Sequence, residues 1–224
     1  MGAAIGDMLP SASGVAISPI PIIAVILMLV SERGKVNGAA FVVGWWLGVG
    51  LVLTVVLLLA DSTGASSEDE PATWVSLLQV ALGVLLLWTA ARQWNGLPKD
   101  GEQAPMPKWM QALDTFTPMK SASIGVLLSG LNPKNLLLTI AGATAIGSAG
   151  VEGGDAVIAA LIFVLVASAG VVIPVALTIA MGARSATMLE ELRVWLTDHN
   201  AAIVVGMLLI FSVKMLGDGL VGLF

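Results

Sequence analysis

Long apolar stretches separated by short polar connections dominate the sequence. Six of them reach the length of about 17 to 25 residues that an α-helix needs to cross a bilayer. They run from Ala12 to Val30, Gly38 to Ala60, Trp74 to Ala91, Ser121 to Gly147, Ala156 to Gly182 and Ala201 to Gly222. The pattern therefore predicts an all-α polytopic membrane protein with six transmembrane helices.

Proline interrupts the first and fourth stretches. The first contains Ser18-Pro19-Ile20-Pro21 and the fourth contains Asn132-Pro133-Lys134-Asn135, while Pro174 lies in the fifth. Because proline has no amide hydrogen and its ring clashes with the preceding turn, the first and fourth helices should break at these motifs. Lipid cannot satisfy the freed carbonyls, so we expect the broken backbone to line a cavity inside the protein.

The connections alternate in charge. The first, third and fifth connections, with their flanks, contain eight of the ten Lys and Arg residues, namely Arg33, Lys35, Arg92, Lys99, Lys108, Lys120, Arg184 and Arg193. The second and fourth connections contain only acidic charges, among them Glu68 and Glu152. Since basic connections stay in the cytoplasm, the pattern predicts that the N- and C-termini both lie outside.

The two halves of the single membrane domain each have three predicted helices. Residues 1–95 form the first half, 96–120 a cytoplasmic connection and 121–224 the second half. An odd number of helices per half lets the two halves enter the membrane from opposite sides, as inverted repeats do. The proline-bearing stretches then lie at matching positions, which is typical of a transporter site.

Two connections contain amphipathic patterns. Apolar residues recur at helical spacing between Pro105 and Phe116, and again between Thr187 and Leu196, where Thr187 and Glu190 suggest a capping box. We expect two helices that lie flat at the cytoplasmic interface, where anchoring alone explains the pattern.

The remaining two basic residues, Lys134 and Lys214, lie within predicted spans. A lysine at that depth costs roughly 2.5 to 3.5 kcal/mol on insertion scales, so each should have a partner or a use. Lys214 has Asp218 four residues on, whereas Lys134 has no acidic neighbour at helical spacing. Two mid-span cations without a mid-span carboxylate favour an anionic substrate.

The candidate site combines these residues. We expect Ser18, Pro19, Pro21, Asn132, Pro133, Lys134, Asn135 and Lys214 to bind substrate, and Asp218 and Asp7 to serve as an ion-pair or coupling group. With no cysteine, no tyrosine and a single histidine, His199, no metal site, cofactor or catalytic set is expected, and the chain is predicted not to be an enzyme. No nucleic-acid partner is expected either.

The motifs resemble those of the LysE superfamily of bacterial exporters. Pro19-Ile20-Pro21 and Asn132-Pro133-Lys134 stand where that superfamily has a proline-rich motif in helix one and an Asn-Pro-Lys motif in helix four. The closing Lys214-Met215-Leu216-Gly217-Asp218-Gly219 is similar to the actinobacterial Gap/Sap branch of glycolipid- and sulfolipid-addressing proteins. Ile20 departs from the Pro-Gly-Pro of the amino-acid exporters. The resemblance implies six helices in two inverted halves and the export or flipping of cell-envelope lipids across the bacterial cytoplasmic (inner) membrane.

Three functions remain open on the sequence. The first is a translocator that moves an anionic or glycosylated envelope lipid outward, with its headgroup between the broken helices and with membrane lipids as partners. The second is an exporter of small solutes such as amino acids or organic anions. The third is a non-transporting assembly factor for an envelope-lipid synthase, and a homodimer is compatible with all three.

Overall fold

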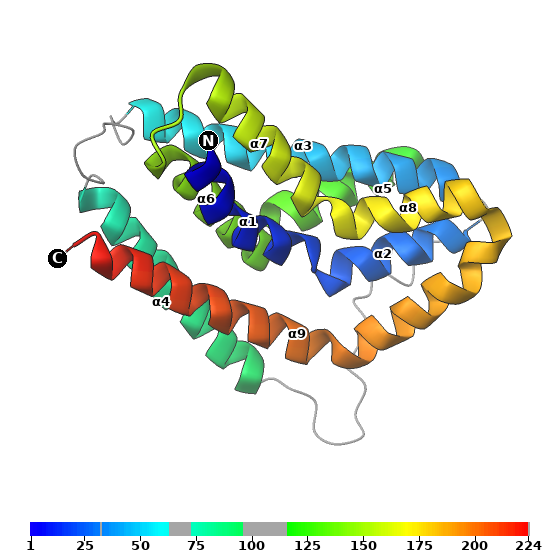
Figure 1. Ribbon diagram of the computed structural model, residues 1–224. Coiled ribbons are helices and arrows are strands. Elements are labelled where there is room, and N and C mark those ends of the chain that lie inside the picture. Colours follow the sequence, from blue (N-terminus) through cyan, green and yellow to red (C-terminus); the bar gives the residue numbers. More distant parts are fainter. Residues whose placement is uncertain (32, 63–72, 96–115, 224) are drawn as a thin grey trace.

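The structure is a computed structural model that describes residues 1–31, 33–62, 73–95 and 116–223, and within these ranges all regular structure is helical (Figure 1). The predicted all-α class is confirmed. In chain order the elements are α1 (Gly2–Ala16), α2 (Pro19–Val30), α3 (Gly34–Ser62), α4 (Thr73–Asn95), α5 (Pro118–Val126), the π-helical turn η2 (Leu127–Leu131), α6 (Pro133–Ser148), α7 (Gly153–Ala167), α8 (Ala169–Met181), the 3-10 turn η3 (Gly182–Ser185) and α9 (Ala186–Val221).

The helices have the length and apolar composition of a multi-pass membrane protein. Three of them, α3, α4 and α9, are long and apolar enough to cross a bilayer without interruption. Three further pairs reach the same criteria together but bend at their junction, by 50° between α1 and α2, 62° between α5–η2 and α6, and 63° between α7 and α8. Each bent pair corresponds to one predicted span, which gives up to six crossings.

The first span begins earlier than the sequence pattern suggests. Helix α1 starts at Gly2 rather than near Ala12, and Pro10 lies inside it. The helix then ends at Ala16, and α2 begins at Pro19. Because the span bends by 50° at this point, it needs the additional turns of α1 to cover the same depth.

The fifth span bends at Ser168, not at Pro174. Pro174 lies inside α8 without ending it. The bend brings Gly170 against the first span, where a methyl group added to Gly170 would lie 2.0 Å from the carbonyl oxygen of Ala16. The break of the fifth span therefore packs beside the break of the first.

The second amphipathic segment is helical, but it is continuous with the sixth span. We expected a separate helix up to Leu196 and a new start near Ala201, whereas α9 runs unbroken from Ala186 to Val221. The polar residues between them do not interrupt it, because Thr197 donates back to the carbonyl of Arg193 over 2.8 Å and Nδ1 of His199 lies 2.8 Å from the carbonyl of Trp195. The expected capping box does not form, since Glu190 pairs with Arg193 instead.

Three helix pairs make the most extensive contacts: α4 along α9, α3 along α5, and α1 along α6 (Figure 1). Glycines permit the closest approach between α3 and α5. A methyl group on Gly44 would lie 1.9 Å from the carbonyl oxygen of Ala122, and one on Gly48 would lie 2.0 Å from Oγ of Ser129. The Gly44–Gly48 pair thus serves helix packing, and Trp45 beside it is buried and stacked on Phe41.

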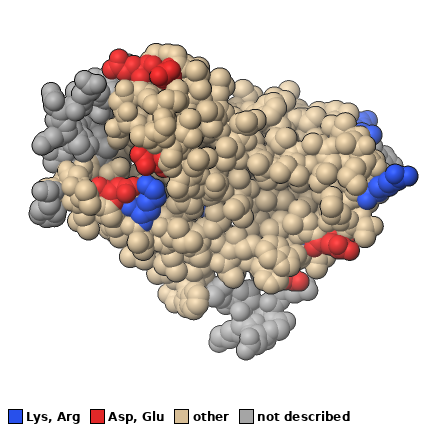
Figure 2. Space-filling model, in the orientation of Figure 1, with Lys and Arg blue, Asp and Glu red and all other residues tan. Residues whose placement is uncertain are grey.

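Charged side chains gather toward the two ends of the molecule and leave a wide uncharged belt between them (Figure 2). We call one end, with the α2–α3 and α8–α9 connections and with Arg33, Lys35 and Arg184, the basic end. The opposite end, with both chain termini and the α6–α7 connection that contains Glu152 and Asp155, is the acidic end (Figure 1). This separation matches the alternating charge of the connections.

Two features named from the sequence fall outside the described residues. These are the amphipathic segment from Pro105, of which only Phe116 is described, and the acidic residues Glu68 to Glu70 of the second connection. Phe116 accepts a 3.0 Å hydrogen bond at its carbonyl from Nδ2 of Asn37, which ties the start of α5 to the start of α3.

Candidate functional site

The two proline-bearing breaks have the same local construction. Ser18 and Asn132 are extended residues that precede Pro19 and Pro133, and each proline occupies the first turn of the following helix. Proline is favoured there because its missing amide hydrogen has no helical partner in any case, and it disfavours helical backbone in the residue before it. Both spans are therefore interrupted by their own sequence.

Protein groups satisfy the backbone around the second break. Oδ1 of Asn132 caps α6 by accepting from the amide of Lys134 over 3.1 Å. Nδ2 of Asn135 reaches back across η2 and donates to the carbonyl of Leu128 over 2.9 Å. A widened turn before the proline leaves carbonyls without their usual partners, so this side chain replaces one missing backbone hydrogen bond.

The two breaks are joined by side-chain hydrogen bonds. Oγ of Ser18 donates to Oδ1 of Asn135 over 2.5 Å and accepts from Nζ of Lys134 over 2.8 Å. Nζ of Lys134 also donates to the carbonyl of Gly14 over 2.9 Å. Ser18 is therefore the central member of a buried network between α1, the first break and α6.

The ammonium group of Lys134 is buried among neutral groups. The residue is 7% exposed, and both of its hydrogen-bond partners are uncharged oxygens. Among the described residues no carboxylate forms a salt bridge with it. An ammonium has three hydrogens to donate and two are used, so one donor remains available to a bound anion.

A pocket of about 190 Å³ adjoins Lys134. The break residues Ser18, Pro19, Pro21, Asn132 and Pro133 line it together with Lys134, and we call it the Lys134 pocket. Its opposite wall comes from α4 and α9 and includes three polar side chains, Thr89, Gln93 and Asn200. Oδ1 of Asn200 is buried and has no hydrogen-bond partner in the described part of the chain, so it can accept from a bound molecule.

Asn135 and Lys214 occupy different positions from those we expected. Asn135 is fully buried beneath the pocket and supports it through Ser18 and Leu128 rather than lining it. Lys214 does not line the Lys134 pocket; it lies in a second pocket of about 370 Å³. The structure thus separates the two lysines that the sequence placed in one cavity.

The second pocket, which we call the acidic-end pocket, contains the remaining predicted residues. Asp7 of α1 and Lys214 and Asp218 of α9 line it together. Nζ of Lys214 donates to Oδ2 of Asp218 over 2.5 Å, and the two side chains are 27% and 41% exposed. Lys214 therefore has a charged partner, unlike Lys134.

Several residues of the Lys134 pocket or its network escaped the sequence analysis, among them one backbone group and three polar side chains. Gly14 contributes a backbone carbonyl, which no side-chain pattern reveals. Thr89, Gln93 and Asn200 are polar residues near the ends of apolar stretches, where they resemble ordinary interfacial residues. The sequence marks these three residues only as polar positions inside or beside a predicted span, and such positions are candidates for the protein interior.

Comparison with known families gives one match. The model of a family described as Sap, sulfolipid-1-addressing protein, matches residues 8–221, nearly the whole chain. The resemblance to the Gap/Sap branch is thereby confirmed. No curated protein and no solved structure matches the chain.

Proposed function

We propose that this chain, which belongs to the family of Sap, the sulfolipid-1-addressing protein, is a transporter of the cytoplasmic membrane. Its cargo is an anionic or glycosylated envelope lipid, which it moves outward. The observation that carries the proposal is the ammonium of Lys134, which is buried between two broken spans and, within the described ranges, is paired only with neutral oxygens. The lipid headgroup binds in the Lys134 pocket and leaves when the two halves of the protein rearrange around the breaks.

The chemistry of Lys134 supports an anionic cargo. A buried cation without a carboxylate keeps a large part of its desolvation penalty, and an anion that enters the pocket relieves it. The free ammonium hydrogen and the neutral polar wall of Thr89, Gln93 and Asn200 can hydrogen-bond to the same headgroup. A sulfate ester, as a sulfolipid carries, has the required charge and acceptor oxygens.

The distribution of the remaining charges supports the outward direction. If the basic end faces the cytoplasm, as connections rich in Lys and Arg generally do, both termini and the acidic end face outward. Thr89 and Gln93 in the wall of the Lys134 pocket belong to the last turns of α4, whose first turns line the acidic-end pocket, so in this proposal a headgroup enters from the side away from the acidic end.

The size of the Lys134 pocket favours a cargo that places only its charged part inside the pocket. Its volume of about 190 Å³ is below the roughly 300 to 1,000 Å³ of pockets that enclose whole drug-sized ligands. A lipid meets this condition because its acyl chains stay in the bilayer. The same volume also suits a small anion that is enclosed completely, so a small-solute exporter is the second candidate.

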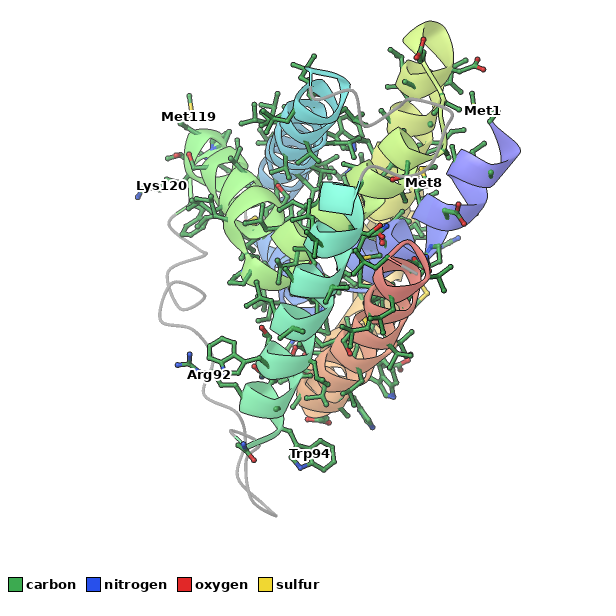
Figure 3. The ribbon with its side chains drawn as sticks, turned by 90° about the vertical axis from the view of Figure 1, so that its left-hand side faces the viewer. Met1, Met8, Arg92, Trp94, Met119 and Lys120 are labelled. Atoms are coloured by element: carbon green, nitrogen blue, oxygen red, sulfur yellow. The ribbon has the colours of Figure 1, made fainter. Side chains whose placement is uncertain are left out.

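The proposal is tested by identifying what the purified protein retains. Lipids and small anions bound to the protein in mild detergent are quantified by mass spectrometry, for the original chain and for Lys134→Met. We expect an anionic lipid in the original chain and its loss in Lys134→Met. The matched control is Lys120→Met, because Lys120 is exposed and points away from the helices (Figure 3).

Each result has a defined meaning. Retention of the same lipid by Lys134→Met at the original level would overturn the headgroup site. A small anion in place of a lipid, lost in Lys134→Met and kept in Lys120→Met, would favour the solute exporter.

A further inference from the structure

The Lys134 pocket and the acidic-end pocket lie along the same four spans. Residues of α4, α6 and α9 line both pockets at two different levels, and the first span contributes Ser18 and the start of α2 to the Lys134 pocket and Asp7 of α1 to the acidic-end pocket. On α4 the two levels are marked by Gln79 and Thr89, which at the rise of an α-helix are about 15 Å apart. That distance is about half of a hydrocarbon core of roughly 30 Å.

A layer of apolar side chains fills the space between the two levels. Leu86 of α4, Leu138 of α6 and Phe211 of α9 are buried there. Phe211 is seated on Gly14 of α1, since a methyl group on Gly14 would lie 2.5 Å from Cε2 of Phe211 and 2.9 Å from Cδ1 of Leu138. Gly14 is also the residue whose carbonyl binds Lys134, so the apolar layer begins directly beside the ammonium.

The two pockets differ in charge. The Lys134 pocket has one cation and no carboxylate among its lining residues. In the acidic-end pocket the charge of Lys214 is matched by Asp218, and Asp7 adds a further negative charge. An anion is therefore attracted to the first pocket and weakly repelled by the second, which favours release there.

We propose that the two pockets are consecutive binding sites along one route between the first span (α1, Ser18 and α2), α4, α6 and α9, and that the ring of Phe211 on Gly14 is the gate between them. The acidic-end pocket is the site from which an anionic headgroup is released. The identity of the cargo rests on the function proposed above, whereas the route and its gate do not.

Thiol labelling tests the gate. The sequence has no cysteine, so a single introduced cysteine is the only reactive thiol. Thr89→Cys reports on the Lys134 pocket and Ser148→Cys on the acidic-end pocket. Sealed vesicles are treated with a small, membrane-impermeant methanethiosulfonate reagent on the side from which Ser148→Cys reacts.

From that side, Thr89→Cys should react at least about tenfold more slowly than Ser148→Cys while Phe211 is present. Phe211→Ala should remove most of that difference. Phe211→Val is the second variant, for the case that the alanine variant does not fold. The matched control is Phe163→Ala, because Phe163 is equally buried and seated on Gly142 but belongs to α7, outside the route.

Fast labelling of Thr89→Cys with Phe211 in place would overturn the proposal. Unchanged slow labelling of Thr89→Cys in a folded Phe211 variant would overturn it as well. Equal acceleration by Phe163→Ala would also overturn it, because the effect would then be a general loosening of the core. Labelling requires no lipid, so a failed gate and a failed cargo assignment give separate results.

Discussion

The hydroxyl of Ser18 donates a hydrogen bond of 2.5 Å to the amide oxygen of Asn135, a residue 117 positions away in the other half of the chain. The same hydroxyl oxygen accepts from Lys134. The two broken spans therefore share one polar network, and neither break can move without changing the hydrogen bonds of the other.

Removing this hydroxyl should destabilise the protein. Ser18→Ala leaves the buried oxygen of Asn135 without a donor and Lys134 with a single acceptor, so we expect a loss of about 1 to 3 kcal/mol in the free energy of unfolding. The measurement is reversible unfolding in mixed micelles. Ser31→Ala is the control, because the hydroxyl of Ser31 makes a local hydrogen bond to the carbonyl of Met28 three residues earlier. An equal loss in both variants would contradict the central role of Ser18.

The Lys214–Asp218 pair should contribute little to stability. A pair this accessible is typically worth about 0.2 to 1 kcal/mol, well below a buried pair. A double-mutant cycle with Lys214→Met and Asp218→Asn should give a coupling energy in this range, and added salt should reduce it. A coupling energy of several kcal/mol would mean that the pair is buried in the membrane-embedded protein.

Asn200 should show a trade-off between stability and binding. Its amide oxygen is buried without a partner in the described part of the chain, and replacing such a group by an apolar one removes the penalty of roughly 1 to 3 kcal/mol for an unmade hydrogen bond. We expect Asn200→Leu to raise the thermal midpoint of the protein and to lower the amount of retained ligand. A lower midpoint would indicate that Asn200 supports the fold.

The contact between α3 and α5 should tolerate no side chain at Gly44. A methyl group there meets the carbonyl of Ala122 at 1.9 Å, so Gly44→Ala should destabilise by about 1 to 3 kcal/mol. Gly50 lies in the same helix with open space around it, and Gly50→Ala should be neutral or stabilise by roughly 0.5 to 1 kcal/mol. Thermal unfolding of the two variants measures the difference, and similar midpoints would contradict tight packing at Gly44.

The parts of the fold that depend on composition could be predicted. Apolar stretches and prolines define the spans and the breaks at Pro19 and Pro133 locally, because the effect of proline on a helix needs no tertiary contact. The deep burial of Lys134 followed from the same stretch. The hydrogen bond from Lys134 to the carbonyl of Gly14 could not be predicted, because every residue offers a carbonyl and only the packing of the helices selects one.

Features that depend on packing could not be predicted. The bend at Ser168 accompanies the close approach of Gly170 to Ala16, a contact between spans one and five that no local pattern reveals. The apolar pattern predicts a new helix start near Ala201, yet α9 continues through this stretch, where the side chains of Thr197 and His199 bond within the helix. Lys214 is near the middle of its apolar stretch, but the start and tilt of the helix decide which pocket it reaches.

The continuous course of α9 has a mechanical consequence. At 36 residues it is about 54 Å long, well beyond the roughly 30 Å hydrocarbon core, and it curves from the basic end to the acidic end (Figure 1). Its amphipathic first turns, Asn200, Phe211 and Lys214 belong to one rod. A change in bilayer thickness that tilts this rod would displace a wall of each pocket and the aromatic ring between them in a single motion, so the thickness of the host membrane should itself influence how readily the route opens.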